Sequence, residues 1–96
     1  MRGYQFTHEA RAALDGQLDY LISQHAQDAA AALNVSVHAF IRDTLARYPA
    51  TGRHLADRNL WETWIPKTRL VIWYTFTDDI LTVVAVWHTA QDRERS

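Results

Sequence analysis

The sequence predicts an α+β domain: an N-terminal strand and a two-helix antiparallel hairpin packed on one face of a mainly antiparallel four-stranded sheet. Three observations lead to this prediction. Apolar residues recur every three or four positions through the first half of the chain, as in amphipathic helices. The second half contains runs of β-branched and aromatic residues separated by turn dipeptides. The 96 residues suffice for one hydrophobic core and contain no dividing linker, so residues 1–96 form a single predicted domain.

The first half predicts a short edge strand followed by two helices. Residues 3–7 alternate enough for a strand, and Thr7 can cap a helix with Glu9 in its first turn. Residues 25–28 resemble a tight turn, after which a second apolar stripe continues until Pro49 stops the helix. The short connection makes the two helices antiparallel neighbours.

The second half predicts a loop, three strands and a polar tail. Residues 49–59 are expected to form a loop, because Pro49 and Gly52 interrupt a polar stretch. The dipeptides Pro66-Lys67 and Asp78-Asp79 mark the turns between the later strands. The expected strands are residues 60–65, 68–77 and 80–88, and the polar tail is about residues 89–96.

A two-residue loop at Asp78-Asp79 would set the register of the last hairpin. In that register Arg69 lies opposite His88, and the side chains divide between two faces. One face is apolar throughout, includes Trp87, and suits the helices. Two helices cover only one face, so the other face is expected to be an exposed binding surface. That surface would hold Arg69, Val71, Trp73, Val84, Val86 and His88, with Trp64 stacked across from Arg69.

The composition of the chain argues against several classes of function. The net charge is −1, and Lys67 is the only lysine, so a protein that coats a nucleic-acid backbone is not expected. The sequence has no cysteine and no histidine spacing typical of a metal site, so we expect neither a metal nor a cofactor. We expect a cytoplasmic protein, because no apolar run resembles a signal peptide or approaches the roughly 20 residues of a membrane span.

Three segments together resemble the RelE/ParE superfamily of toxins from bacterial type II toxin–antitoxin systems. They are P-x-x-G-R from Pro49 to Arg53, R-x-V-I-W-Y from Arg69, and V-x-H-x-x-Q-D-R from Val86 to Arg93. The resemblance covers nearly the whole chain. It implies a toxin neutralised by a cognate antitoxin that wraps its sheet and helices, and hence a hetero-oligomer without a membrane partner.

The superfamily contains two activities, and the resemblance favours the gyrase-directed ParE branch. RelE-like members cut mRNA on the ribosome and are strongly basic, often with an arginine, a histidine or lysine, and a C-terminal tyrosine. Arg69 and His88 match the first two positions, but Thr89 follows the histidine and no tyrosine lies beyond it. The alternative is therefore a ribosome-dependent mRNA endonuclease using Arg69 and His88. A third reading is a non-toxic adaptor that keeps only the antitoxin-binding surface.

The residues assigned to these roles fall into two groups. Both Arg69 and His88 also have ordinary structural readings: Arg69 could pair with Glu62 or Asp92, and His88 could be a strand-end histidine bonded to backbone. The predicted seat for a ParD-like antitoxin comprises Trp64, Arg69, Val71, Trp73, Val84, Val86 and His88. The predicted contacts to DNA gyrase comprise Gln91, Asp92, Arg93 and Arg95.

Overall fold

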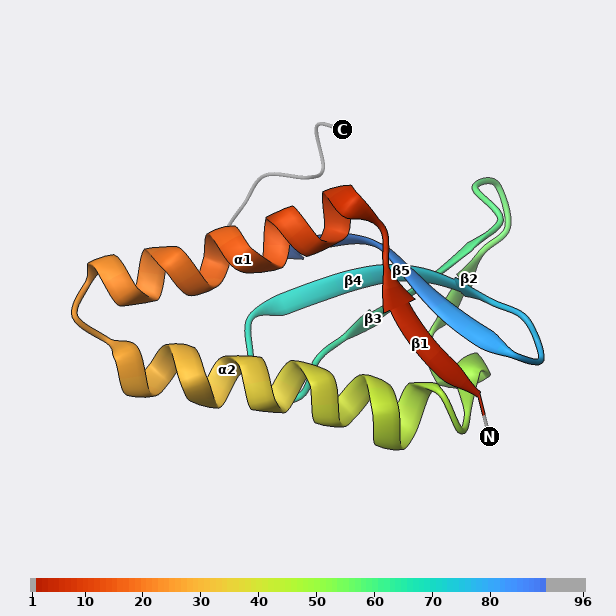
Figure 1. The fold of residues 1–96 in the computed structure, drawn as a ribbon. Coiled ribbons are helices and arrows are strands. Elements are labelled where there is room, and N and C mark those ends of the chain that lie inside the picture. Colours follow the sequence, from red (N-terminus) through yellow and green to blue (C-terminus); the bar gives the residue numbers. More distant parts are fainter. Residues whose placement is uncertain (1, 90–96) are drawn as a thin grey trace.

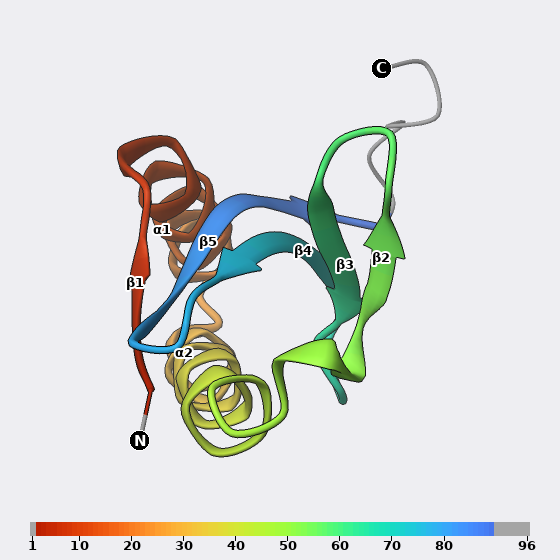
Figure 2. The same ribbon diagram turned by 90° about the vertical axis from the view of Figure 1, so that its right-hand side faces the viewer.

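The structure is a computed structural model that describes residues 2–89. Two antiparallel helices lie side by side in front of a five-stranded sheet (Figure 1). The strand order is β1-β5-β4-β3-β2, with β1 parallel to β5 and every other pair antiparallel. Figure 2 shows the sheet curving from β1 around to β2. The elements are β1 (Gly3–Phe6), α1 (His8–Ser23), α2 (Gln27–Phe40), η1 (Ile41–Leu45), η2 (Pro49–Thr51), β2 (Arg53–Leu55), β3 (Leu60–Trp64), β4 (Leu70–Phe76) and β5 (Ile80–His88).

The helices begin and end close to the predicted positions. The Thr7 side chain accepts a hydrogen bond from the Ala10 backbone N–H at 3.1 Å, which confirms the predicted cap of α1. The second helix begins at Gln27 without a side-chain cap, and Asp28 lies in its first turn, where the helix dipole favours an acidic residue. It continues beyond Phe40 as one π-helical segment, η1, before Pro49 starts the short 3-10 helix η2.

The hydrophobic core lies between the helices and one face of the sheet. Tyr74, Leu81 and Val83 point from the central strands β4 and β5 toward the helices and are fully buried. Helix α1 contributes Ala10 and Leu14. The second helical segment contributes Val37, Ile41 and Leu45.

The prediction of four strands was wrong by one, because part of the predicted loop 49–59 forms β2. Arg53, His54 and Leu55 pair with Glu62, Trp61 and Leu60 of β3. This strand has only three residues and no buried apolar position, so its hydrogen bonds to β3 define it rather than its own pattern.

The turn between β3 and β4 is longer than the predicted dipeptide. The Ile65 N–H donates to the Leu70 carbonyl at 3.0 Å, so four residues, 66–69, form the connection. Trp64 consequently lies opposite Val71, and the predicted contact of Trp64 with Arg69 was wrong. The turn is held by Thr68, whose hydroxyl donates to the Ile65 carbonyl at 2.7 Å and accepts from the Leu70 N–H at 3.0 Å.

The last hairpin follows the predicted register only for its first half. The two-residue loop is present: the Thr77 N–H donates to the Ile80 carbonyl at 2.8 Å, and Tyr74 lies opposite Val83. A β-bulge then shifts the pairing by one, because Trp73 lies opposite Ala85 and leaves Val84 as the extra residue. Its carbonyl accepts a 3.4 Å hydrogen bond from the Thr7 hydroxyl at the end of β1.

Candidate functional site

The bulge exchanges the two faces of β5 beyond Val84. Cross-strand partners share a face, so Val86 and His88 lie on the helix side opposite Ile72 and Leu70. Val86 is 7 % exposed and belongs to the core. The predictions that Val86 and His88 lie on the helix-free face, and that His88 pairs with Arg69, were therefore wrong.

Arg69 and His88 nevertheless line one pocket, on the helix side of the sheet. This helix-side pocket has a volume of about 780 Å³. The turn of residues 67–70 and His88 at the end of β5 form one wall, and residues of the two helices form the other. The helical wall consists of Gly16, Gln17, Tyr20 and Leu21 from α1 and Leu33 from α2.

The β3–β4 turn fixes how the pocket presents its positive charge. Lys67 has a positive φ of 67°, a left-handed conformation at the tip of the turn. Thr68, the next residue, is half-buried and bonded to the backbone of Ile65 and Leu70 on the two sides of the turn, whereas Lys67 and Arg69 are exposed. The turn thus holds two cationic side chains on either side of an anchored threonine.

The helix-free face carries a linked group of aromatic and charged side chains. Trp73 donates from its indole N–H to a carboxylate oxygen of Glu62 at 2.9 Å, and Arg53 donates to the other oxygen at 2.8 Å. The Arg58 guanidinium lies 4.9 Å from the Trp73 ring centroid. Trp87 contacts Trp73 edge to face at 4.7 Å, so its predicted place on the helix-covered face was wrong.

Val71 and Trp64 lie on this second face as predicted, but only Trp64 is exposed. Val71 is 2 % exposed and Trp64 is 66 % exposed. Both line a smaller pocket of about 270 Å³ with Arg53, Glu62 and Thr63. Val71 is therefore a buried support, and Trp64 is the aromatic side chain that a partner can reach.

The P-x-x-G-R segment has a clear structural role. The Tyr74 hydroxyl donates to the Pro49 carbonyl at 2.6 Å and accepts from the Gly52 N–H at 3.1 Å. A Cβ atom on Gly52 would lie 2.6 Å from both the Glu62 carbonyl oxygen and the Tyr74 hydroxyl, which is too close. Glycine is required here so that Arg53, the next residue, can lie beside Glu62.

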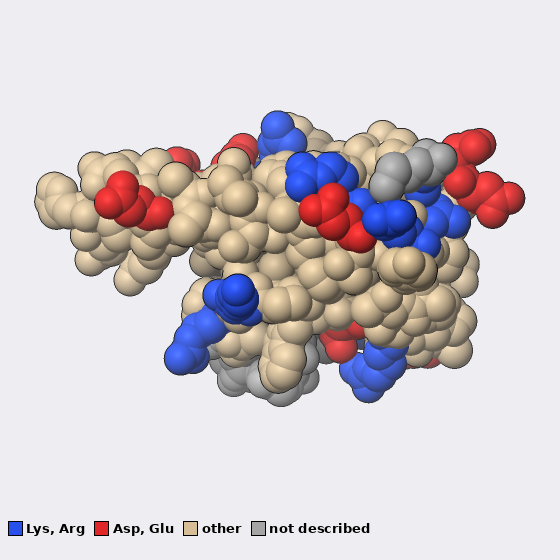
Figure 3. Space-filling view, turned by 90° about the horizontal axis from the view of Figure 1, so that it is seen from below, with Lys and Arg blue, Asp and Glu red and all other residues tan. Residues whose placement is uncertain are grey.

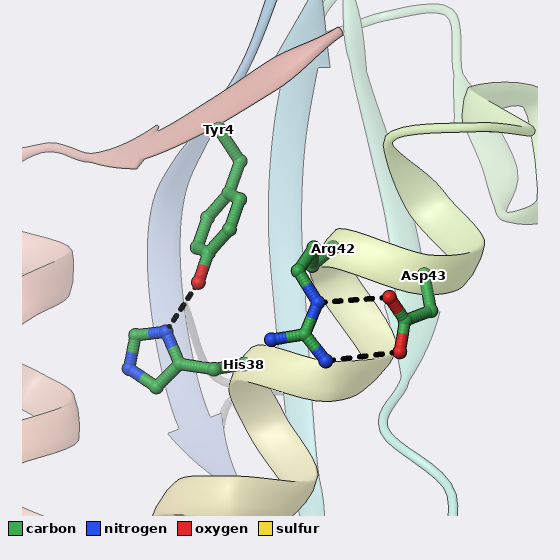
Figure 4. A network of polar contacts seen from close by, with 4 residues as sticks. All are labelled: Tyr4, His38, Arg42 and Asp43. Atoms are coloured by element: carbon green, nitrogen blue, oxygen red, sulfur yellow. Dashed lines mark hydrogen bonds and ion pairs between the residues drawn. The ribbon is translucent and has the colours of Figure 1, made fainter. Parts of the chain in front are cut away.

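A second polar cluster joins β1 to α2 (Figure 4). The Tyr4 hydroxyl and His38 Nδ1 are 2.8 Å apart, and the imidazole also packs against Phe6 at 5.7 Å. Burial, with smaller contributions from the positive charges of Arg11 and Arg42, lowers the pKa of His38 below its ordinary value.

Arg42 itself makes a two-point hydrogen bond with Asp43, at 2.8 and 3.0 Å (Figure 4). That bond raises the pKa of Arg42 and lowers the pKa of Asp43.

Charge on the face seen from below is mixed (Figure 3). Seen from below, most of the surface is uncharged, and the basic side chains toward its right-hand end lie close to acidic ones (Figure 3). Arg2 donates to the Ala46 carbonyl at 2.6 Å and lies 5.5 Å from the Phe76 ring centroid, so its guanidinium is bound within the fold.

The described part of the chain contains neither a metal-binding cluster nor a membrane-spanning helix. Within residues 2–89, no three histidine, cysteine or acidic side chains lie close enough to hold a metal ion. No helix of the same region has the length and hydropathy of a membrane span.

Several residues of these sites were missed by the sequence analysis. Lys67 was assigned only to a turn. The pocket also contains Tyr20, Leu21 and Leu33 of the helices, and no local pattern in the sequence shows that they meet the end of β5. The predicted contacts Gln91, Asp92, Arg93 and Arg95 lie outside the described residues.

Comparison with known proteins identifies the family. The family model described as "ParE toxin of type II toxin-antitoxin system, parDE" matches residues 4–93. A search of curated proteins found no match. Among solved structures, the chromosomal ParDE TA system from P. aeruginosa contains a chain with the same fold, at a TM-score of 0.77 and 12 % identity, covering 92 % of this chain and 96 % of that one. Because the family model spans nearly the whole chain, the protein belongs to the ParE toxin family of type II toxin–antitoxin systems.

Proposed function

We propose that this ParE-family toxin inhibits DNA gyrase in the cytoplasm when free and is neutralised by a ParD-like antitoxin bound to its surface. The match of the family model over residues 4–93 carries this proposal, since that family is defined by the parDE system. Inhibition by binding requires no chemistry from the chain itself, and the target is then a protein complex rather than bare nucleic acid.

The charge of the chain supports a protein target. Ten basic residues are balanced by 11 acidic ones, and several cations are already used within the fold, as with Arg42 and Asp43. Affinity for a nucleic-acid backbone comes from many unpaired lysine and arginine side chains. Gyrase already holds the DNA, so its inhibitor does not need a broad basic surface of its own.

The two faces of the sheet support an antitoxin that contacts more than one site. Trp64, with Arg53 beside it, is exposed on the helix-free face. The helix-side pocket lies on the other face and contains Arg69 and His88. An antitoxin segment that wraps around the end of β4 would contact Trp64 and Arg69, whereas Val71 and Val86 are buried and would not meet it directly.

The experiment is a supercoiling assay with purified gyrase, relaxed plasmid and increasing amounts of the purified chain. The expected result is loss of supercoiling and accumulation of cleaved DNA, both reversed by the antitoxin. Ribosomes translating a defined mRNA are tested in parallel. Cleavage of that mRNA with intact supercoiling would identify the endonuclease alternative, and inactivity in both assays would favour the adaptor alternative.

A further inference from the structure

The outward face of α2 is exposed and carries no charge along its middle. Residues 29–41 contain no lysine, arginine, aspartate or glutamate. Val35, near the middle of this stretch, is 67 % exposed. Helix α2 lies on the lower side of the molecule in Figure 1, and the surface seen from below is mostly uncharged (Figure 3). A helix that faces water normally carries charged side chains on its outer face, so this face is suited to packing against another element.

The residues on this face are arranged symmetrically about Val35. Residues four and seven positions apart share one face of a helix. The residues four positions from Val35 are Ala31 and Ala39. The residues seven positions from it are Asp28 and Arg42, both exposed, so an acidic and a basic side chain end the face. These five residues form what we call the α2 strip.

Such symmetry matches a second copy of the chain that packs antiparallel to the first. A twofold axis beside Val35 brings Asp28 of each copy next to Arg42 of the other copy, so the same ion pair forms twice. Within one copy the two residues are 14 positions apart, about 21 Å along a helix, and cannot pair with each other. The charges of the strip are therefore complementary only between copies.

The side chains at the two ends of the strip are free to make this contact. Arg42 and Asp43 bond to each other, but their side chains are 58 % and 59 % exposed, so the pair contributes little to stability. Asp43 occupies Nε and Nη2 of Arg42, and Nη1 can still donate to a second carboxylate. The small side chains of Ala31 and Ala39 allow two helices to approach closely on either side of Val35.

We propose that two copies of the chain associate through the α2 strip, antiparallel about a twofold axis. Leu33, which lines the helix-side pocket, points to the other side of α2, so the dimer leaves that pocket open. Interfaces below about 1,200 Å² are typical of weak complexes, and one pair of helices forms an interface of this class. The dimer should therefore form in the micromolar range of concentration. The inference does not depend on which target the toxin inhibits.

The first test is sedimentation velocity of the purified full chain over a series from low to high micromolar concentration. The parent chain is expected to change from monomer to dimer along this series. V35E places two like charges together at the axis and should raise the dissociation constant at least about tenfold. N34E is the matched control, because Asn34 is an exposed neighbour outside the strip and the same substitution there should leave the dimer unchanged. Thermal melting checks that both variants fold.

The second test exploits the charges at the ends of the strip. D28K alone and R42E alone each place like charges together across the axis, so each variant should be monomeric at concentrations where the parent chain dimerises. In an equimolar mixture, both ends again bring opposite charges together. A one-to-one heterodimer should then form, and rising salt should weaken it.

Three outcomes overturn the proposal. The first is a parent chain that stays monomeric throughout the series, as expected if another protein covers the strip. The second is a dimer that V35E leaves as tight as before, because the interface then lies elsewhere. The third is a mixture of D28K and R42E that stays monomeric while the parent chain dimerises. Gyrase inhibition is measured separately, so none of these outcomes bears on the proposed toxin function.

Discussion

The Tyr74 hydroxyl lies 2.6 Å from the carbonyl oxygen of Pro49, joining the centre of the sheet to the segment that leaves the helices. The same oxygen accepts a hydrogen bond from the Gly52 N–H at 3.1 Å. One buried phenol thus satisfies two backbone groups of the P-x-x-G-R segment, and it orients the chain just before β2 begins. Burial also raises the pKa of Tyr74, so the phenol stays neutral and keeps its proton for Pro49.

The substitution Y74F removes this oxygen and leaves both backbone groups without their partner. We expect the free energy of unfolding to fall by about 1–3 kcal/mol, the usual cost of an unsatisfied buried polar group. Urea unfolding followed by circular dichroism measures it. Y48F is the matched control, because Tyr48 is an exposed tyrosine whose loss of a hydroxyl should change little. Equal stability of Y74F and the parent chain would show that the hydrogen bonds contribute nothing net.

Two glycines should respond to alanine with opposite signs. G52A places a Cβ atom 2.6 Å from a backbone oxygen, so the β2–β3 pair must shift and stability should fall by about 1–3 kcal/mol. G16A lies within α1 and meets nothing within 4 Å, so it should stabilise the fold by up to about 1 kcal/mol. Thermal melting of both variants checks the prediction, and a stable G52A would contradict the packing argument.

The helices and the last three strands could be predicted from the sequence because their signals are local. The apolar spacing of α1 and the run of β-branched and aromatic residues in β4 are both signals within a single short segment. The strand β2 could not be found this way, since Arg53-His54-Leu55 has no buried pattern and its partner lies in β3. The pairing of β2 with β3 also requires glycine at position 52, because a Cβ atom there would lie 2.6 Å from the Glu62 carbonyl oxygen of β3.

The candidate site was predicted less well, for one specific reason. The segment around Val84 is a continuous run of small apolar residues, so inserting one extra residue leaves no visible break in alternation. A shift of one residue nonetheless moves every later side chain to the opposite face. His88 therefore lies with the helices, and Trp87 lies beside Trp73. The faces predicted for His88 and Trp87 were therefore wrong.

His38 should make stability depend on pH. Its pKa is lowered in the folded state, so the unfolded chain binds the extra proton more readily. Stability is therefore greatest above the unfolded pKa of about 6.5, declines as the pH falls toward the folded pKa, and levels off below it. The groups that face the imidazole of His38 are two aromatic rings and two guanidinium groups, from Tyr4, Phe6, Arg11 and Arg42.

Urea unfolding at several pH values, for the parent chain and H38Q, isolates this contribution. The difference in stability between the two should shrink or change in favour of H38Q as the pH falls through that window. Glutamine has no charge to acquire, so any acid sensitivity that remains in H38Q belongs to other groups. Parallel curves for the two proteins across the whole range would contradict the assignment to His38.

The last prediction concerns the ending H-x-x-Q-D-R, where Gln91, Asp92, Arg93 and Arg95 were assigned to the target. The double variant R93A/R95A should weaken gyrase inhibition by about a hundredfold or more if each arginine makes a charge-assisted hydrogen bond, worth about 1.5–3 kcal/mol. Its melting temperature should match that of the parent chain. R47A serves as the control for loss of a surface arginine. Undiminished inhibition by R93A/R95A would place the gyrase contacts elsewhere on the molecule, and the exposed Trp64 beside Arg53 would then be the next residue to replace.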